Sequence, residues 1–599
     1  MMIPSKTFLT TLFVVATISF SGQAQEKNPD LQRELTLEKE YSPHLRDANK
    51  LNSLPEIKEP EAPKTKVEFS NYTLDYPLSP YFQKLGVINY FPGFADSDQR
   101  GYLTGGLGTL FNIDGDAGYQ ILQSETNRLS IFASHRSSNG NVSYLQKDDV
   151  KRKMKINDNW LGVDFLHRFK KAALSADAQY TYSAFNYYGF PPPFLFFMYL
   201  EEDNLPEYNF SVNQVNNLMK THLGLTSAEN EGLNYRLNLT HTLLEHRRAD
   251  IIELTGKTEN RILLDVDLYA HINATTGIGT DIAVKTYFYH MPDDLRRISN
   301  DFLGNHDYTT IILDPYLTLE GDTWNARLGI KENIQLGGIK KFLLAPDIRF
   351  YWRPSDPVLL YLTVDGGIKD NSDYNIYYEN RYLNPQYRIY DSRSPLDAKL
   401  GLTFSPVNAW SVNLFSAYQW VKKEHFYFNE WYFNFPVSES SATGQKMLPQ
   451  YADAQVFQLG GSMKYHYQDQ WDLGLKVVYN QWKVTKFSDK INTNSFSELI
   501  AWNQPVFTGD WNVGYKITAI PLRMDLNYHL ETGRKAVDMG STTIQMKNIH
   551  DVNVAATYTI HKDLSVFGKI NNLLFQKYDL WYGYPAQGFN IMLGANLKF

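Results

Sequence analysis

Apolar and polar residues alternate strictly along several stretches of the chain. They do so in LRMDLNYHL (residues 522–530), GLNYRLNLT (232–240), LLDVDLYA (263–270) and ALSADAQYTY (173–182). Successive side chains of a β-strand point to opposite faces, so each stretch predicts a strand with one apolar and one polar face. A single strand of this kind is also typical of a soluble sandwich. Its repetition along the chain, with aromatic residues at strand ends, favours a transmembrane β-barrel.

The chain ends on one more strand of this type, GFNIMLGANLKF (588–599). Its alternate residues are apolar, and polar or small residues stand between them, with Met592 as the exception. We expect the apolar set to face lipid and the strand to close the barrel by pairing with the first strand near Tyr102. The apolar set is Phe589, Ile591, Leu593, Ala595, Leu597 and Phe599.

Short and long connections alternate between the predicted strands, as they do in outer-membrane barrels. Short connections are predicted near 124–127, 170–172, 229–232, 273–276, 320–322, 354–357, 406–409, 468–470, 519–521 and 561–563. Longer stretches lie mostly between them, at 136–156, 188–213, 291–305, 369–393, 425–450, 486–508, 532–546 and 574–587. The predicted fold is all-β: an antiparallel up-and-down transmembrane barrel of about 22 strands, within a range of 16 to 24 strands. The first and the last strand are both expected to have their free ends at the side of the short turns.

The first residues predict export. Lys6 is followed by an apolar core over residues 8–20 and by small residues that end at Ala24, as in a secretory signal peptide cleaved after Ala24. A membrane anchor would need about 20 unbroken apolar residues, more than this core supplies. The predicted organisation is a signal peptide (1–24), an irregular N-terminal segment (25–100) and the barrel (101–599).

Composition narrows the function classes. Aromatic residues make up 15% of the chain, and mean hydropathy is −0.40. The chain has no cysteine, which excludes disulfides, thiolate metal sites and thiol nucleophiles. A net charge of −7 offers no electrostatic footprint for nucleic acid.

The C-terminal stretch KINNLLFQKYDLWYGYPAQGFNIMLGANLKF (569–599) resembles the end of TonB-dependent receptor barrels. The resemblance rests on an Asn-Leu-Phe-like segment (572–575), on Tyr578, on residues 583–588 and on the terminal Phe599. It implies a Gram-negative outer-membrane protein that contacts lipid and binds or passes a nutrient. It also implies that the barrel-assembly machinery recognises the last strand, through Phe599, Leu597 and Leu593.

The N-terminal segment departs from that family, whose plug domain is about twice as long. Residues 25–100 are rich in charge and proline and too poor in apolar residues to fold alone, so we expect the plug to be missing or reduced to a peptide. ELTLEKEY (34–41) resembles the peptide by which such receptors bind TonB, which would use Glu34, Leu35, Thr36 and Leu37. The alternative is a periplasmic tether, or an extended filler of the lumen.

Three predicted extracellular stretches are rich in aromatic residues. YYGFPPPFLFFMYL (187–200) is almost wholly apolar, which indicates a surface for a partner, a ligand or lipid, or else a cap folded over the mouth. HFYFNEWYFNFP (425–436) and YNIYYENRY (374–382) are amphipathic and could hold sugars or peptides, although such residues also occur in aromatic girdles and protein interfaces. The candidate surface residues are Tyr187, Tyr188, Phe190, Phe194, Phe196, Phe197, Trp431 and Tyr432.

Signals for chemistry are weak, and we expect no enzyme activity, cofactor or metal. DSDQRG (96–101) lacks the later ligands of a calcium loop, and Asp114 with Gly115 is better interpreted as a hairpin turn. No His-Glu-x-x-His pattern occurs. Two hypotheses therefore remain. The first is a transporter or channel that resembles TonB-dependent receptors, binds a nutrient at its aromatic extracellular loops and passes it, with or without TonB. The second is a subunit of an outer-membrane assembly that holds a surface lipoprotein or another outer-membrane subunit, with its pore filled by its own N-terminal segment and loops.

Overall fold

The computed structural model describes residues 99–145, 151–189, 213–228, 232–248, 256–292, 306–337, 341–385, 387–407, 409–429, 446–468, 470–487, 498–537 and 542–599. Within these residues, none of the helices has the length and apolarity needed to cross a membrane. All of the described residues belong to one compact unit.

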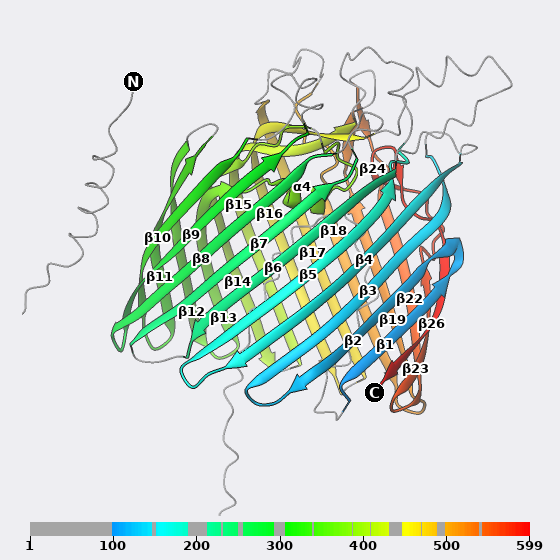
Figure 1. Cartoon of the computed structure of the whole chain (residues 1–599), viewed down its shortest axis with the longest axis horizontal. Helices are drawn as coiled ribbons and strands as arrows, with labels where there is room; N and C mark the ends of the chain where they lie inside the picture. Colours follow the sequence, from blue (N-terminus) through cyan, green and yellow to red (C-terminus); the bar gives the residue numbers. More distant parts are fainter. Residues whose placement is uncertain are drawn as a thin grey trace, which may run out of the picture. The chain divides into compact units, whose positions relative to one another are not determined.

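Twenty-two antiparallel strands form a closed barrel, in which each strand pairs with its neighbours in the chain (Figure 1). The first strand, β1 (Gly101–Gly108), pairs with the last, β26 (Asn590–Lys598), and Tyr102 lies opposite Lys598. The prediction of about 22 strands closed near Tyr102 is therefore confirmed. The other wall strands are β2 (Ile113–Gln123), β3 (Asn127–Ser143), β4 (Lys151–Arg168), β5 (Ala172–Asn186), β6 (Asn213–Ser227), β7 (Leu233–His246), β8 (Thr258–Asn273), β9 (Thr276–His290), β10 (Tyr308–Glu320), β11 (Trp324–Leu336), β12 (Lys341–Ser355), β13 (Val358–Lys369), β14 (Ser392–Val407), β15 (Trp410–Asn429), β16 (Met447–Tyr467), β17 (Trp471–Phe487), β18 (Phe507–Ile517), β19 (Leu522–Thr532), β22 (Ile549–His561) and β23 (Leu564–Asn571).

All ten predicted short connections join consecutive strands at one end of the barrel, the short-turn end. The chain enters and leaves the barrel there, since the amides of Arg100 and Gly101 both donate to the Phe599 carbonyl at 2.7 Å. One prediction is wrong. Asp114 and Gly115 lie inside β2, and the turn comes earlier, at the 3₁₀ helix η1 (Thr109–Phe111).

The two faces of the wall follow the alternation in the sequence. On the outside, Leu593 on β26 is 68% exposed and Phe599, directly after it, is 55% exposed, whereas Asn590 and Met592 point inward and are buried. Many other apolar side chains are exposed on the outer face, as expected of a surface that meets lipid: Leu161, Ile278, Ile330, Leu400, Leu414 and Leu459.

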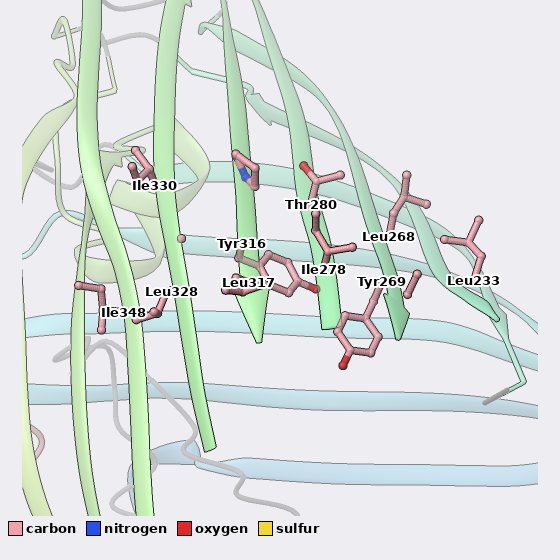
Figure 2. Close-up of a pocket in the computed structure, with 14 residues that line it drawn as sticks. Leu233, Leu268, Tyr269, Ile278, Thr280, Tyr316, Leu317, Leu328, Ile330 and Ile348 are labelled. Atoms are coloured by element: carbon pink, nitrogen blue, oxygen red, sulfur yellow. The ribbon is translucent and has the colours of Figure 1, made fainter. Parts of the chain in front are cut away.

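The outer wall contains a shallow apolar groove that crosses β7 to β12 (Figure 2). Figure 2 labels Leu233, Leu268, Ile278, Leu328 and Ile330 along it, all on the outward-facing side of their strands. Its lining offers almost no polar groups to fix a ligand, so we assign the groove to the apolar outer surface rather than to a functional site.

Polar and aromatic side chains cover the inner face. Arg327 on β11 contacts the carboxylates of Asp281 at 2.6 Å, Asp314 at 3.0 Å and Asp347 at 2.5 Å. Several aromatic rings lie flat over a glycine directly opposite on the next strand, which leaves no room for a Cβ there. These pairs are Tyr102 with Gly118, Phe132 with Gly162, Tyr316 with Gly279, Tyr361 with Gly401, Phe415 with Gly460 and Phe567 with Gly594.

Candidate functional site

Four connections at the long-loop end fold into the mouth of the barrel and form what we call the mouth cap. Their described residues are 370–385 and 387–391, with the helix α4 (Asp373–Glu379); 498–506; 533–537 and 542–548, with β20 (Lys535–Val537) and β21 (Thr543–Gln545); and 577–589, with β24 (Asp579–Trp581) and β25 (Tyr584–Pro585). Figure 1 places α4 and β24 at this end of the barrel.

The cap has an apolar core of its own, in two clusters that combine cap residues with inward-facing wall residues. Tyr584 and Ile376 are fully buried in the first cluster, and Trp502 is fully buried in the second. Burial of an aromatic or aliphatic side chain contributes roughly 1.5–3 kcal/mol. The first cluster also contains Val142, Met154, Ile156, Phe185, Tyr187, Tyr188, Tyr382, Leu383, Tyr427, Met447 and Trp581, and the second Phe426, Phe428, Leu448, Ala452, Ala454, Phe487 and Val537.

Helix α4 is attached to β8 through its N-terminus. The Ser372 side chain caps the helix by accepting from the Asn375 amide. The Glu259 carboxylate on β8 accepts from the amides of Asp373 at 2.7 Å and Tyr374 at 3.3 Å, which are otherwise unpaired in a first helical turn. A buried ion pair joins Lys257 to Asp373 at 2.8 Å, with 1% and 3% of the side chains exposed.

The chain that follows α4 is attached to β4. Arg381 donates two hydrogen bonds to Asp158, at 2.9 and 3.3 Å, and Asp158 also accepts from the Ser183 hydroxyl at 2.6 Å. Burial alone would lower the pKa of Arg381, but the Asp158 carboxylate raises it above its usual range. The pair is therefore charged and bidentate, the strongest kind of side-chain hydrogen bond.

The end of α4 is attached to β15. Glu379 accepts from the His425 ring at 2.5 Å and from the Tyr427 hydroxyl at 2.8 Å. Burial would raise the pKa of Glu379, but His425 and, more weakly, Lys369 and Tyr427 lower it to about 2. The carboxylate therefore remains ionised at neutral pH.

The other connections cross the mouth and meet the first. Tyr188 donates to the Pro585 carbonyl at 3.1 Å, and the Tyr382 and Tyr584 rings stack with centroids 4.1 Å apart. Arg534 donates to the carbonyls of Asp579 and Leu580, both at 2.9 Å. Connections far apart in the sequence thus form one packed layer.

Little free space is left within the described part of the cap. The crevice lined by Tyr187, Asn216, His246, Asp373 and Arg381, among others, has a volume of about 10 Å³, the lower limit for one water molecule. No cluster of acidic or histidine side chains suited to a metal ion occurs among the described residues. This crevice is therefore too small to hold a ligand.

Two of the predicted surface residues pack against this cap. Tyr187 and Tyr188 are 2% and 3% exposed and pack inward, as in the alternative that folds their loop over the mouth. Leu593, Leu597 and Phe599 face outward on β26 and at its end. The N-terminal segment up to residue 98 lies outside the described residues. So do the other candidates: Phe190, Phe194, Phe196, Phe197, Trp431, Tyr432 and the TonB-peptide residues Glu34, Leu35, Thr36 and Leu37.

Sequence reasoning missed the charged residues that attach the cap. Of the two amphipathic stretches, 374–382 supplies most of α4 and also Arg381, and the described part of the other, His425 to Asn429, forms the buried end of β15. A local signal for the helix existed, because Ser372 stands directly before the first helical residue and serine favours the N-cap position. No local signal paired Arg381 with Asp158, which lies 223 residues away.

Comparisons with known proteins separate fold from function. No family model matches the chain, and no curated protein matches it in sequence. Solved barrels do match in structure. The FrpB iron transporter from Neisseria meningitidis has 10% identity and a TM-score of 0.62, over 84% of this chain and 82% of its own. The chain has the barrel fold of TonB-dependent receptors.

Two further receptor barrels match equally widely. The copper transporter OprC has 10% identity and a TM-score of 0.59, over 84% of this chain and 80% of its own. The siderophore receptor PirA from Pseudomonas aeruginosa has 11% identity and a TM-score of 0.53, over 84% of this chain and 81% of its own. Identities this low show the shared fold alone, so they confirm the fold that the C-terminal resemblance implies and leave the ligand open.

Proposed function

We propose that this receptor-like barrel is a gated passage for a small nutrient across a Gram-negative outer membrane. The mouth cap carries the proposal, because it packs against the inner wall of a polar lumen at the end where the connections are long. Long connections face outward in outer-membrane barrels, so the cap would be the extracellular gate. The matched receptors and transporters support a role in nutrient uptake for this fold.

The attachment of the cap suits a gate. Side-chain ion pairs and hydrogen bonds attach it to the inner wall, and these bonds can break while the barrel ladder stays intact. Leaving one partner of a buried ion pair without the other costs about 3–5 kcal/mol, and the cap contains at least two such pairs, Lys257 with Asp373 and Arg381 with Asp158. Spontaneous opening would therefore be rare, and opening would need a ligand or energy from TonB through residues 34–37.

Conductance through the purified barrel tests this proposal. In a planar bilayer with potassium chloride, we expect the full chain to be closed. A variant with residues 371–390 replaced by a short Gly-Ser linker should conduct, because the main contacts of α4 are removed. Correct folding is checked by heat-modifiable migration on a gel. A folded variant that remains closed would contradict the gate.

The second candidate is a non-transporting subunit of an outer-membrane assembly. The tight packing of the cap favours it, since a permanent closure needs no space for a ligand. Here the N-terminal segment would also fill the lumen. Removing residues 26–80 together with 371–390 should then open a pore that neither deletion opens alone. Purification in mild detergent would reveal stoichiometric partners, such as a surface lipoprotein or another outer-membrane subunit.

A further inference from the structure

We infer that the apolar side chains of two turns beside the closing strands enter the lipid bilayer and complete the apolar band where the barrel wall is too short. The turns are residues 109–112, between β1 and β2, and residues 572–576, after β23; we call them the seam turns. This inference rests on the proposed outer-membrane location. It assigns a lipid-binding surface to residues outside the strands.

The wall is shortest at the closing strands. β1 and β23 have 8 residues each and β26 has 9, whereas β16 has 21. At about 3.4 Å per residue and a tilt of about 45°, eight residues rise about 19 Å along the barrel axis. An outer-membrane barrel needs an apolar band of roughly 25 Å, so these three strands do not cross the hydrocarbon layer on their own.

The seam turns carry the apolar side chains that fill this deficit. Phe111 is 75% exposed, Phe575 66% and Leu574 54%, among the most exposed large apolar side chains of the described residues. They continue the outward surface of Leu107 and Leu593, which lie opposite each other on β1 and β26 and are each 68% exposed. The patch is thus continuous with the apolar outer wall.

The backbone of the seam turns has several of its polar groups hydrogen-bonded, which lowers the cost of placing it beside lipid. The amides of Leu573 and Phe575 donate to the carbonyls of Val552 and Asn572, at 2.8 and 2.9 Å. The side chain of Asn572 bonds both the amide and the carbonyl of Gln576, at 2.9 and 2.8 Å. At the other turn, the Gly108 amide donates to the Asn112 carbonyl at 2.7 Å.

Unusual backbone conformations hold the exposed rings in place. Phe111 and Phe575 have φ angles of 50° and 53°, in the left-handed region that bulky side chains rarely adopt. Such residues cost of order 1–3 kcal/mol each, so their surroundings must enforce them. The polar side chain next to Phe111 points to the opposite side, where Asn112 bonds Gln587 at 3.1 Å. An apolar outer side and a polar inner side suit a lipid surface.

Spin labels at single cysteines test the inference, and the cysteine-free chain makes such labelling clean. Phe111→Cys and Phe575→Cys are labelled in liposomes of known lipids, and collision with oxygen is compared with collision with a water-soluble nickel complex. Leu400→Cys on the outer face of β14 is the lipid control, and Lys170→Cys in a short turn is the water control. Heat-modifiable migration shows that each variant is folded.

We expect the labels at Phe111 and Phe575 to behave like the label at Leu400, accessible to oxygen and protected from nickel. Labels that behave like Lys170 would overturn the inference while Leu400 still reports a barrel in the bilayer. Nickel access at Leu400 itself would instead contradict the proposed membrane location. In native membrane vesicles, protection of the seam labels from both reagents would identify a protein as the occupant, which would also overturn the inference.

Discussion

At the residue scale, the cap depends on a few buried polar or charged side chains that are each matched by a partner on the inner wall. Glu259, Asp158 and His425 lie on three different strands, and each receives one part of residues 372–381. Buried polar groups are costly unless they are hydrogen-bonded, so each pair also fixes the position of the chain. Loss of one partner should loosen one attachment and leave the others.

The pKa of Glu379 gives this region a defined pH response. Its pKa falls from 4.5 to about 2 on folding, so ionised Glu379 stabilises the cap above about pH 4.5, and this contribution is lost as the pH falls toward 2. A shift of this size corresponds to about 3 kcal/mol.

Glu379→Gln keeps the shape of the side chain but removes its charge. We expect pepsin to cut residues 374–382 faster in the variant than in the wild type at pH 4.5, and at similar rates at pH 2. A difference that is the same at both pH values would contradict this role.

At the element scale, neighbouring strands are held together by rings that lie over glycines on the inner face. An added Cβ at Gly401 would lie 2.2 Å from the Tyr361 ring, which would have to leave the sheet. By contrast, no heavy atom lies within 4 Å of a Cβ added at Gly105, on the outer face of β1. The two glycines therefore form a matched pair for mutation.

We expect Gly401→Ala to destabilise the barrel by about 1–3 kcal/mol, because an overpacked site must shift its neighbours. Gly105→Ala should change stability by less than about 0.5 kcal/mol. The midpoint of urea unfolding in detergent measures both. Tyr361→Ala in the Gly401→Ala background should remove the clash and make the added methyl group harmless. Equal midpoints for the two single variants would show that the ring moves aside freely.

The last strand offers a second test at this scale, of Phe599 as an assembly signal. Phe599→Ala keeps the backbone bonds to Arg100 and Gly101, so the purified variant should fold in detergent as well as wild type. In cells we expect much less of it in the outer membrane, if the assembly machinery reads the terminal ring. Leu593→Ala is the control, because Leu593 also faces outward on β26 but is not the terminal residue. It shows how much of the effect comes from a general loss of apolar surface. Equal membrane levels of Phe599→Ala and wild type would count against the signal.

At the scale of the whole molecule, the gate requires the cap to move while the barrel stays closed. Leu383 in the cap forms an isolated parallel bridge with Met447 on β16, which brings their backbones close enough for a disulfide. The oxidised Leu383→Cys, Met447→Cys variant should need more urea than the reduced form to conduct in a planar bilayer. Each single-cysteine variant is the control. Identical opening of the oxidised and reduced forms would mean that this part of the cap does not move.

Several features of the barrel could be predicted because their signals are local. The alternation in 522–530 or 588–599 indicates which side chains share the apolar outer face of a strand. The short connections indicate how many strands there are and at which end of the barrel each pair is joined. The hairpin prediction at Asp114 failed for a local reason as well. Asp-Gly is compatible with a turn, but Gly115 instead pairs with Gly105 inside the wall, after an earlier turn at η1.

The sequence by itself thus determined a β-rich barrel with an apolar outside, a polar inside and both barrel ends at the short-turn side. Only the tertiary structure decided which residues pack together at the mouth. Arg381 meets Asp158 and Tyr188 meets Tyr584 because the cylinder brings opposite walls within reach of the long connections. Such contacts have no fixed spacing in the chain, whereas strand alternation repeats every two residues. A periodic signal can be read locally, and a contact across the mouth requires the closed barrel.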